Sequence, residues 1–245
     1  MQTHQKWLDE YAKNSTVIWH NESMVTIKNI RNFRYGCNGE VIPSWYTKTI
    51  DICGIKKMNL VLSYWGGEHI AHVFLTFNTA YDKWVAISIE TRRRLTQKWS
   101  AVNGFFPVYP LIYIVGDERD LIGVRTDIRK ERVYLYELDV SSELCQQLFS
   151  EYLRKINKLN LHSEKFNSLK NNCTTNILSH ARAISPVLRY NWRLLLSGHT
   201  AEYCFMKGLI KSDLPFTKLK EKSMLEAGML TSNYEDFSAA IRHVY

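Results

Sequence analysis

The sequence predicts an α+β fold in which an antiparallel sheet packs against helices. Segments rich in β-branched and aromatic residues fill the chain up to about residue 140, and helical spacing dominates after it. Of the 245 residues, 45% are hydrophobic and 23% are charged, which is typical of globular chains and not of disordered ones. Because there is no repeat and no linker, we expect one domain over residues 1–245, strand-rich over 17–140 and helix-rich over 141–245.

The strands are predicted from alternating or β-branched runs that follow a short polar helix or arm over residues 1–15. They are expected at 24–30, 46–52, 58–64, 70–78, 83–92, 111–115 and 132–140. We interpret the charged turn at residues 116–120 as an ion-pair network that fixes its loop, with a substrate entrance for an anionic head group as the alternative. The aromatic loop at 99–110 is expected to cap the core, or less readily to form an apolar rim.

The helices are predicted from apolar residues at helical intervals. Ser141 and Ser142 are suitable caps for the first of them, which carries Leu144, Leu148 and Tyr152 on one side. Further helices are expected at 174–182, 187–196, 201–207, 216–225 and 234–243, with Gly198 and Gly208 as stop signals.

Charge and cysteine usage narrow the classes of partner. A formal net charge of +8 predicts a basic face that meets solvent or an anionic membrane, and no nucleic-acid-binding motif is present. No run approaches the roughly 18–20 apolar residues of a membrane span, and no secretory signal is visible, so we expect a cytosolic chain or one whose leader or anchor is missing. Five dispersed cysteines indicate neither a disulfide scaffold nor a metal site, and we expect no cofactor. The cysteines expected to be structural are Cys37, Cys53, Cys145 and Cys204.

Cys173 is the candidate nucleophile, because it lies where a loop turns into a helix. Asn171 and Asn172 precede it as turn and N-cap residues. The unpaired N–H groups and the dipole of a helix N-terminus favour the thiolate and can hold an oxyanion. The alternative is a small, buried structural cysteine.

His72 is the candidate base, and Glu90 its candidate orienting group. A short loop joins the strands at 70–78 and 84–90 into an expected hairpin. If Asn78 faces Trp84, then His72 faces Glu90 on the same side of the sheet. A one-residue shift in register would turn Glu90 away. The alternatives are a satisfied core histidine and a solvated glutamate.

Seven motifs occur in one order within residues 17–242. They are 27–35 (IKNIRNFRY), 62–65 (LSYW), 72–77 (HVFLTF), 88–93 (SIETRR), 111–121 (LIYIVGDERDL), 171–176 (NNCTTN) and 196–203 (LSGHTAEY). Together they resemble the Lnb N-terminal periplasmic domain family, and a run of matched motifs is more specific than any one of them.

The resemblance implies a bacterial lipoprotein N-acyltransferase, which moves an acyl chain from a phospholipid to the N-terminal amine of a lipoprotein. It implies a fold similar to circularly permuted papain-like (NlpC/P60-type) thiol enzymes, with Cys173 as nucleophile, His72 as base and Glu90 as orienting group. It also implies a periplasmic location at the outer face of the cytoplasmic membrane, with peripheral membrane contact.

Four further residues are candidates for binding substrate, and two other functions stay open. The candidates are Arg119 and Arg125, which suit an anionic head group, and Asn172 and Tyr64, which lie in the matched motifs. The first alternative function is a papain-like hydrolase, an amidase, peptidase or esterase with water as acceptor. The second is a non-catalytic module that binds lipid or protein. An acyl-enzyme that survives water and turns over only with an amine separates the transferase from the hydrolase.

Overall fold

The computed structural model describes residues 6–36, 40–79, 83–97, 109–167, 171–184, 193, 196–228 and 236–242. Its strands are β1 (Thr16–Trp19), β2 (Met24–Arg31), β3 (Arg34–Tyr35), β4 (Val41–Ile42), β5 (Trp45–Asp51), β6 (Met58–Gly66), β7 (Ile70–Asn78), β8 (Trp84–Thr91), β9 (Leu111–Asp117) and β10 (Arg132–Glu137). The predicted strands are therefore confirmed with small shifts at their ends, whereas β1, β3 and β4 were not predicted.

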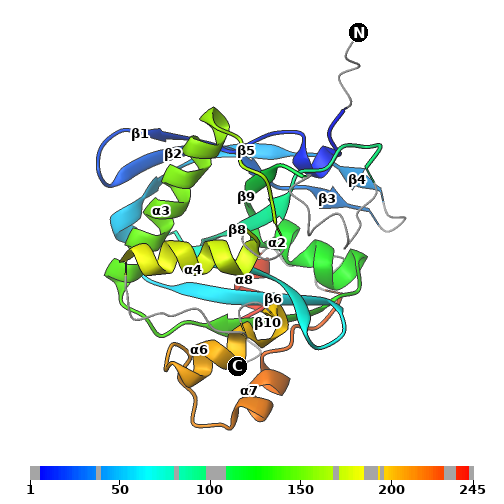
Figure 1. The fold of residues 1–245 in the computed structure, drawn as a ribbon, viewed down its shortest axis with the longest axis vertical. Coiled ribbons are helices and arrows are strands. Elements are labelled where there is room, and N and C mark those ends of the chain that lie inside the picture. The colour runs from blue at the N-terminus through cyan, green and yellow to red at the C-terminus, as the bar shows by residue number, and fades with distance from the viewer. Residues whose placement is uncertain are drawn as a thin grey trace.

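A single large sheet organises the fold (Figure 1). Its strands follow the order β1-β2-β9-β8-β7-β6-β10, and β5 pairs with β2 outside this path. The pairs are antiparallel apart from a short parallel contact between Arg31 of β2 and Gly116 of β9. This mostly antiparallel sheet with packed helices confirms the predicted α+β architecture.

The helices are α2 (Glu118–Leu121), α3 (Ser142–Leu161), α4 (Cys173–Ile184), α6 (Thr200–Met206), α7 (Phe216–Lys222) and α8 (Phe237–Ala240). Short helical turns occur at η1 (Asp9–Tyr11), η2 (Ile52–Gly54), η3 (Val124–Ile128) and η4 (Ser197–His199). The Ser141 hydroxyl caps α3 by accepting from the Leu144 N–H at 3.3 Å, as predicted. The helix predicted at 187–196 falls almost entirely outside the described residues.

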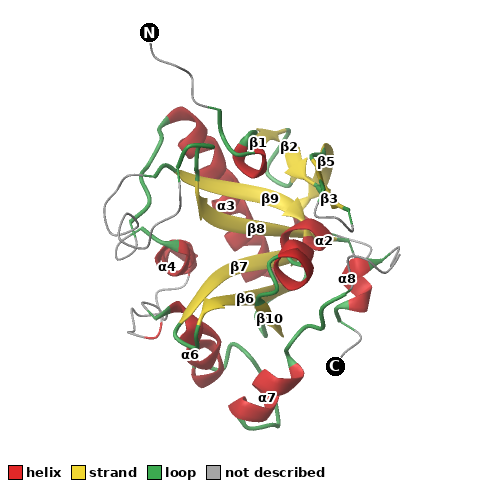
Figure 2. Ribbon diagram, turned by 90° about the vertical axis from the view of Figure 1, so that its right-hand side faces the viewer, coloured by secondary structure: helices red, strands yellow, loops and turns green. Residues whose placement is uncertain are grey.

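The sheet is buried on both faces, because helices cover each side of it (Figure 2). On one face, alternate residues of β7 such as Val73, Leu75 and Phe77 pack with the inner sides of α3 and α4. On the other face, Phe74 packs against α2 and α8. Within the described residues, no helix is both long and apolar enough to cross a membrane.

The helical segment after β9 was not predicted beyond a charged turn. Here α2 begins at the end of β9, where Asp117 caps it through the Arg119 N–H at 3.0 Å. A Cβ atom on Gly116 would lie 2.8 Å from Leu121 Cγ, so only glycine lets α2 fold back onto the strand. The π-helical turn η3 follows and carries Arg125 toward the sheet.

Candidate functional site

The β7–β8 hairpin aligns His72 with Glu90. Asn78 pairs with Trp84, and Thr76 pairs with Ala86, which is the predicted register. This pairing ends at Leu75 and Ile87. Because side chains alternate along both strands, His72 and Glu90 lie on the same face of the sheet beyond that point. His72 Nε2 lies 3.8 Å from Glu90 Oε1, so these two groups are brought together as expected.

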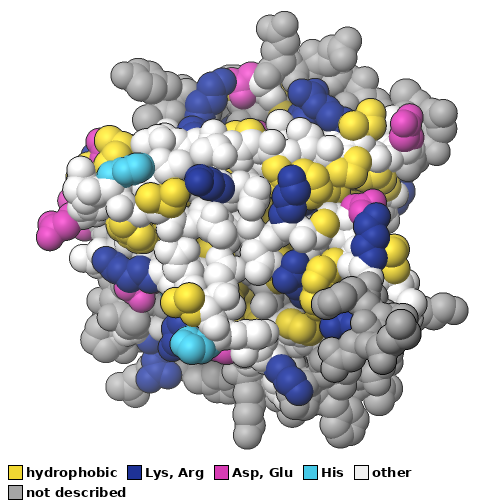
Figure 3. Space-filling model, turned by 90° about the horizontal axis from the view of Figure 1, so that it is seen from above, with side chains coloured by type: hydrophobic (Ala, Val, Ile, Leu, Met, Phe, Trp, Pro, Cys, Tyr) yellow, Lys and Arg dark blue, Asp and Glu magenta, His cyan; other side chains and the backbone are white. Residues whose placement is uncertain are grey.

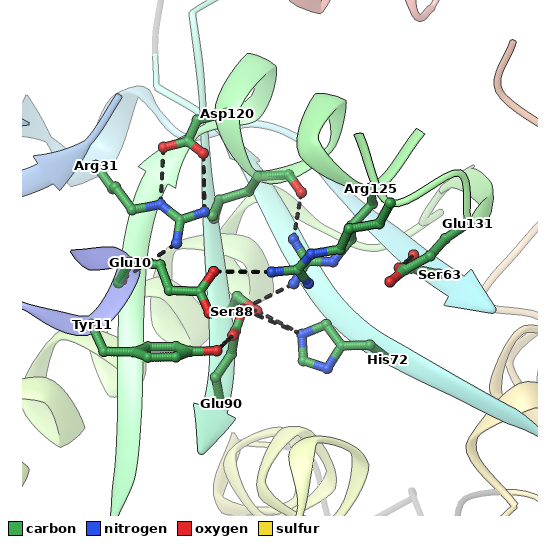
Figure 4. Close-up of polar contacts among 12 residues, drawn as sticks. Glu10, Tyr11, Arg31, Ser63, His72, Ser88, Glu90, Asp120, Arg125 and Glu131 are labelled. Atoms are coloured by element: carbon green, nitrogen blue, oxygen red, sulfur yellow. Dashed lines mark hydrogen bonds and ion pairs between the residues drawn. The ribbon is translucent and has the colours of Figure 1, made fainter. Parts of the chain in front are cut away.

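Ser88 joins the histidine to the glutamate (Figure 4). Its hydroxyl lies 2.7 Å from His72 Nε2 and donates to Glu90 Oε1 at 2.8 Å. The sequence offered one signal for this role, since Ser88 lies two residues before Glu90 and therefore on the same side of the strand. We did not predict Ser88 as a site residue.

Glu90 is held as a carboxylate by two further donors. Arg125 donates to Oε1 at 2.9 Å, and the Tyr11 hydroxyl donates to Oε2 at 3.1 Å. Burial is the largest single influence and opposes the charge of Glu90. Arg125, together with the other basic side chains around it, outweighs burial and holds the pKa of this carboxyl well below its usual range. Arg125 is 2% exposed. The structure therefore assigns Arg125 to Glu90, whereas the sequence suggested a substrate entrance.

His72 is neutral in this network. Burial, assisted by the Arg125 charge, lowers the pKa of His72 to about 3 despite the opposing influence of Glu90. The Ser88 hydroxyl donates its one hydrogen bond to Glu90. It therefore accepts the hydrogen bond from His72 Nε2–H. The proton on Nε2 leaves Nδ1 with a lone pair, and this second nitrogen points away from Ser88 in Figure 4. The arrangement presents a neutral imidazole with a basic nitrogen.

Cys173 is the first residue of α4, as predicted. Asn172 caps this helix, because its side-chain oxygen accepts from the Thr175 N–H at 2.8 Å. In return, the Thr175 hydroxyl accepts from the Asn172 N–H at 2.9 Å, which completes a reciprocal cap. Asn172 is 8% exposed, so it positions Cys173 from below the surface. The structure gives Asn172 this capping contact, and substrate binding by Asn172 stays a prediction.

The environment of Cys173 corrects one expectation. Burial raises the pKa of its thiol, although the backbone N–H groups of Val73, Thr174 and Cys173 itself partly offset that effect. We expected the helix N-terminus to lower the pKa of Cys173 and so favour the thiolate. The effect of burial on this pKa is larger than that of the helix N-terminus. The resting site therefore pairs a neutral thiol with a neutral imidazole.

Cys173 lies against β7, the strand that carries His72. Val73, whose N–H faces the Cys173 sulfur, directly follows His72. Helix α4 packs against both β7 and β8. The negative charge of Glu90 also acts on the thiol and contributes to its raised pKa. The structure thus places the helix that carries the thiol against the two strands that carry His72 and Glu90. Helix α4 packs on the face of Val73, whereas the His72 ring stacks on Phe74 of the other face.

The other two substrate-binding candidates lie in structural contacts. Arg119 donates to the Asn32 side-chain oxygen at 2.6 Å. The Tyr64 hydroxyl donates to the carbonyl oxygen of Gly198 at 2.5 Å, which fastens η4 to the end of β6. Neither side chain contacts His72, Glu90 or Cys173 in the hydrogen bonds of the described residues.

The charged turn at 116–120 is an ion-pair network, as we interpreted it. Asp120 accepts from Arg31 Nε at 2.9 Å and from Arg31 Nη2 at 3.0 Å. Glu118 accepts from Arg242 at 2.8 and 2.6 Å. These contacts tie α2 to β2 and to the segment after α8. The aromatic loop at 99–110 lies outside the described residues except for its last two residues.

The remaining cysteines and histidines do not build a second centre among the described residues. Cys53, Cys145, Cys173 and Cys204 are free, and Cys37 lies outside those residues. No group of three or more His, Cys, Asp or Glu side chains within the described ranges is placed to hold a metal ion.

Comparison with known protein families gives a match over the central part of the chain. The family model described as Lnb N-terminal periplasmic domain matches residues 42–198, which is more than half of the chain. That range contains His72, Glu90 and Cys173. No curated protein and no solved structure matches the chain.

Proposed function

Because the chain belongs to the Lnb N-terminal periplasmic domain family, we propose that it is a cysteine-dependent acyltransferase. It moves an acyl chain from a phospholipid, through a thioester on Cys173, to the N-terminal amine of a bacterial lipoprotein. One observation carries the proposal. On β7, His72 is oriented through Ser88 and Glu90, and the next residue, Val73, directs its N–H at the Cys173 sulfur.

In the first half-reaction, His72 Nδ1 takes the proton of the Cys173 thiol as the sulfur attacks the ester carbonyl carbon. The new C–S bond and the broken C–O bond leave a thioester and a lysophospholipid, whose alcohol oxygen receives the proton from His72. Since thiol and imidazole both start neutral, the proton moves during the attack and not before it.

Glu90 stabilises the imidazolium that forms in this step. Its charge reaches the ring through the Ser88 hydroxyl and directly across 3.8 Å. Arg125 and Tyr11 hold the carboxylate in place. The N–H groups of Cys173 and Thr174 at the start of α4 face the sulfur, and such groups can donate hydrogen bonds to the negative oxygen of the tetrahedral intermediate.

In the second half-reaction, the lipoprotein amine attacks the thioester. His72 accepts a proton from the amine and returns it to the Cys173 sulfur as the amide forms. The order His72, Glu90, Cys173 along the chain fits a circularly permuted papain-like arrangement, in which the base strand precedes the nucleophile helix.

Access to phospholipid is proposed to occur at the membrane surface. The net charge of +8 favours anionic head groups. Figure 3 shows basic side chains spread among hydrophobic ones over one face of the molecule. Such a surface binds membranes reversibly. Since the family is described as periplasmic, the membrane surface proposed for this contact is the outer face of the cytoplasmic membrane.

The test is intact-protein mass spectrometry after incubation with mixed bacterial phospholipids. Wild type is expected to gain a fatty-acyl mass that hydroxylamine removes, and Cys173→Ala is expected to gain none. A serine at this position could trap an oxygen ester, so Cys173→Ser runs beside them. Adding a lipoprotein-type N-terminal peptide should discharge wild type with transfer of the acyl mass to the peptide amine.

Two outcomes would contradict the proposal. Discharge in water alone, at the rate seen with the peptide, would indicate a hydrolase. A folded wild-type protein that gains no acyl mass from any phospholipid would remove the basis for acyl transfer and favour a binding module.

A further inference from the structure

A partly enclosed apolar cavity of about 290 Å³ lies beside the first turn of α4. Its walls come from α3, α4 and α6 and from the strands beneath them. Helix α4 contributes Thr174, Ile177, Leu178 and Ala181, which occupy positions i, i+3, i+4 and i+7 and therefore line one side of the helix. The cavity thus follows α4 for about two turns, or roughly 10 Å, away from Cys173.

The lining is apolar even where hydroxyl groups contribute to it. Thr174 Oγ1 donates to the Asn172 side chain at 2.9 Å, and Thr200 Oγ1 donates to the Ser197 carbonyl at 2.8 Å. Both hydroxyls therefore have partners outside the cavity. The one charged side chain in its walls is Lys207, which is exposed at the end of α6. A cavity with these walls offers almost no polar partner to water, and apolar cavities bind apolar ligands.

The cavity adjoins the candidate nucleophile. Thr174, in its wall, follows Cys173 directly, and Ile177 lies one helical turn from Cys173. Cys173 and Ile177 pack against the same apolar cluster of the sheet. An acyl group bonded to the sulfur would therefore have an apolar path alongside α4.

We propose that this cavity is the binding site for the acyl chain, with the carbonyl carbon at Cys173 and the methyl end toward Ala181. The inference rests on the proposed function for the identity of the group on the sulfur. It adds a chemical class of ligand, an unbranched hydrocarbon chain, and a structural limit on its length.

The test narrows the cavity two turns from the thiol with Ala181→Trp. Ser179→Trp is the matched control, because Ser179 is exposed on the same helix. Ala181→Leu is a second, milder variant in case the tryptophan variant does not fold, and circular dichroism reports the fold of all three. Each methylene that loses its apolar contact costs about fourfold in binding. We therefore expect Ala181→Trp to slow thioester formation from a 16-carbon donor by about tenfold or more. Formation from an 8-carbon donor should stay close to the Ser179→Trp rate.

A second measurement separates this inference from the proposed function. Binding of the fluorescent fatty acid cis-parinaric acid is measured with Cys173→Ala and with the double variant Cys173→Ala, Ala181→Trp, neither of which can form a thioester. Loss of binding in the double variant alone supports the cavity, even if wild type forms no thioester and the proposed function fails. If thioester formation depends on chain length in the same way in Ala181→Trp and Ser179→Trp, the cavity is not the acyl-chain site. The proposed acyltransferase activity would be unaffected by that result. Absence of cis-parinaric acid binding to Cys173→Ala would also show that the cavity is not the acyl-chain site.

Discussion

Two buried arginine–carboxylate pairs connect the sheet to the helical segment after β9 and serve different ends. Asp120 accepts from Arg31 twice, from the Phe33 N–H at 2.8 Å and from the Tyr35 hydroxyl at 2.8 Å. All of these donors belong to the scaffold.

Glu90 accepts from Arg125, Tyr11 and Ser88, and through Ser88 it reaches His72. That network ends in an imidazole whose Nδ1 is not hydrogen-bonded within the described residues. Burial of an ion pair therefore does not identify a site by itself. What distinguishes Glu90 is that its contacts end in an imidazole nitrogen on β7, the strand whose Val73 N–H faces the Cys173 sulfur.

The largest expected effect on stability comes from removing one member of either pair. Asp120→Asn leaves Arg31 buried without its counter-charge, and should lower the free energy of unfolding by about 3–5 kcal/mol. Glu90→Gln should lower the free energy of unfolding by a similar amount, because Arg125 is likewise left buried without its counter-charge. Urea denaturation measures both. An Asp120→Asn variant as stable as wild type would contradict the structural role of this pair.

Ser88→Ala is expected to have a smaller effect, because it removes a neutral bridge and no charge. The His72 Nε2–H loses its acceptor, which should cost about 1–3 kcal/mol of unfolding free energy. Acylation should also slow, since the ring is no longer fixed. Ser150→Ala is the matched control: its hydroxyl donates to the Gln146 carbonyl at 2.8 Å, far from the site. A Ser88→Ala variant that acylates at the Ser150→Ala rate would show that the bridge is not needed.

The neutral His72 predicts a particular dependence of stability on pH. Its pKa is about 3 in the folded protein and near 6.5 in an unfolded chain, so the unfolded chain binds the proton first as the pH falls. Stability should therefore be lost between about pH 6.5 and pH 3, by at most about 1.4 kcal/mol per pH unit from this group. The His72→Gln variant should show a shallower slope in urea denaturation between pH 4 and 6.5. Identical slopes would mean that His72 is not buried as a neutral group.

Removing a helix cap should give the smallest effect on stability. The caps of α4 and α3 again compare a residue beside the site with a residue of the scaffold. Asn172→Ala removes the cap of α4, and Ser141→Ala removes that of α3, so each should cost about 1 kcal/mol of stability. Only Asn172→Ala should also slow acylation, because it alone loosens Cys173. Equal acylation rates in the two variants, measured by mass spectrometry, would contradict a positioning role for Asn172.

The sequence predicted those parts of the site that depend on local periodicity. The alternation of side chains and the short loop after Asn78 were enough to place His72 and Glu90 on the same face of the sheet. The cap at Asn172 was enough to start a helix at Cys173. Both features are set by residues close together in the chain.

The features that the sequence missed depend on distant contacts or on burial. Arg125 reaches Glu90 from an unpredicted π-helical turn, and Arg31 meets Asp120 across 89 positions of sequence. Local periodicity contains no signal for either pair. The raised pKa of Cys173 was missed for a related reason, because desolvation depends on the whole packed environment of the thiol.

The most direct test of the account compares single-turnover rates of Cys173 acylation in three proteins: wild type, Glu90→Gln and Asp120→Asn. Mass spectrometry follows the thioester from one phospholipid, and each rate is corrected for the folded fraction measured in the same buffer. We predict that Glu90→Gln slows acylation by about 100-fold or more, and that Asp120→Asn acylates near the wild-type rate per folded molecule. Equal slowing in both variants, or none in Glu90→Gln, would contradict a catalytic role for the Glu90 network.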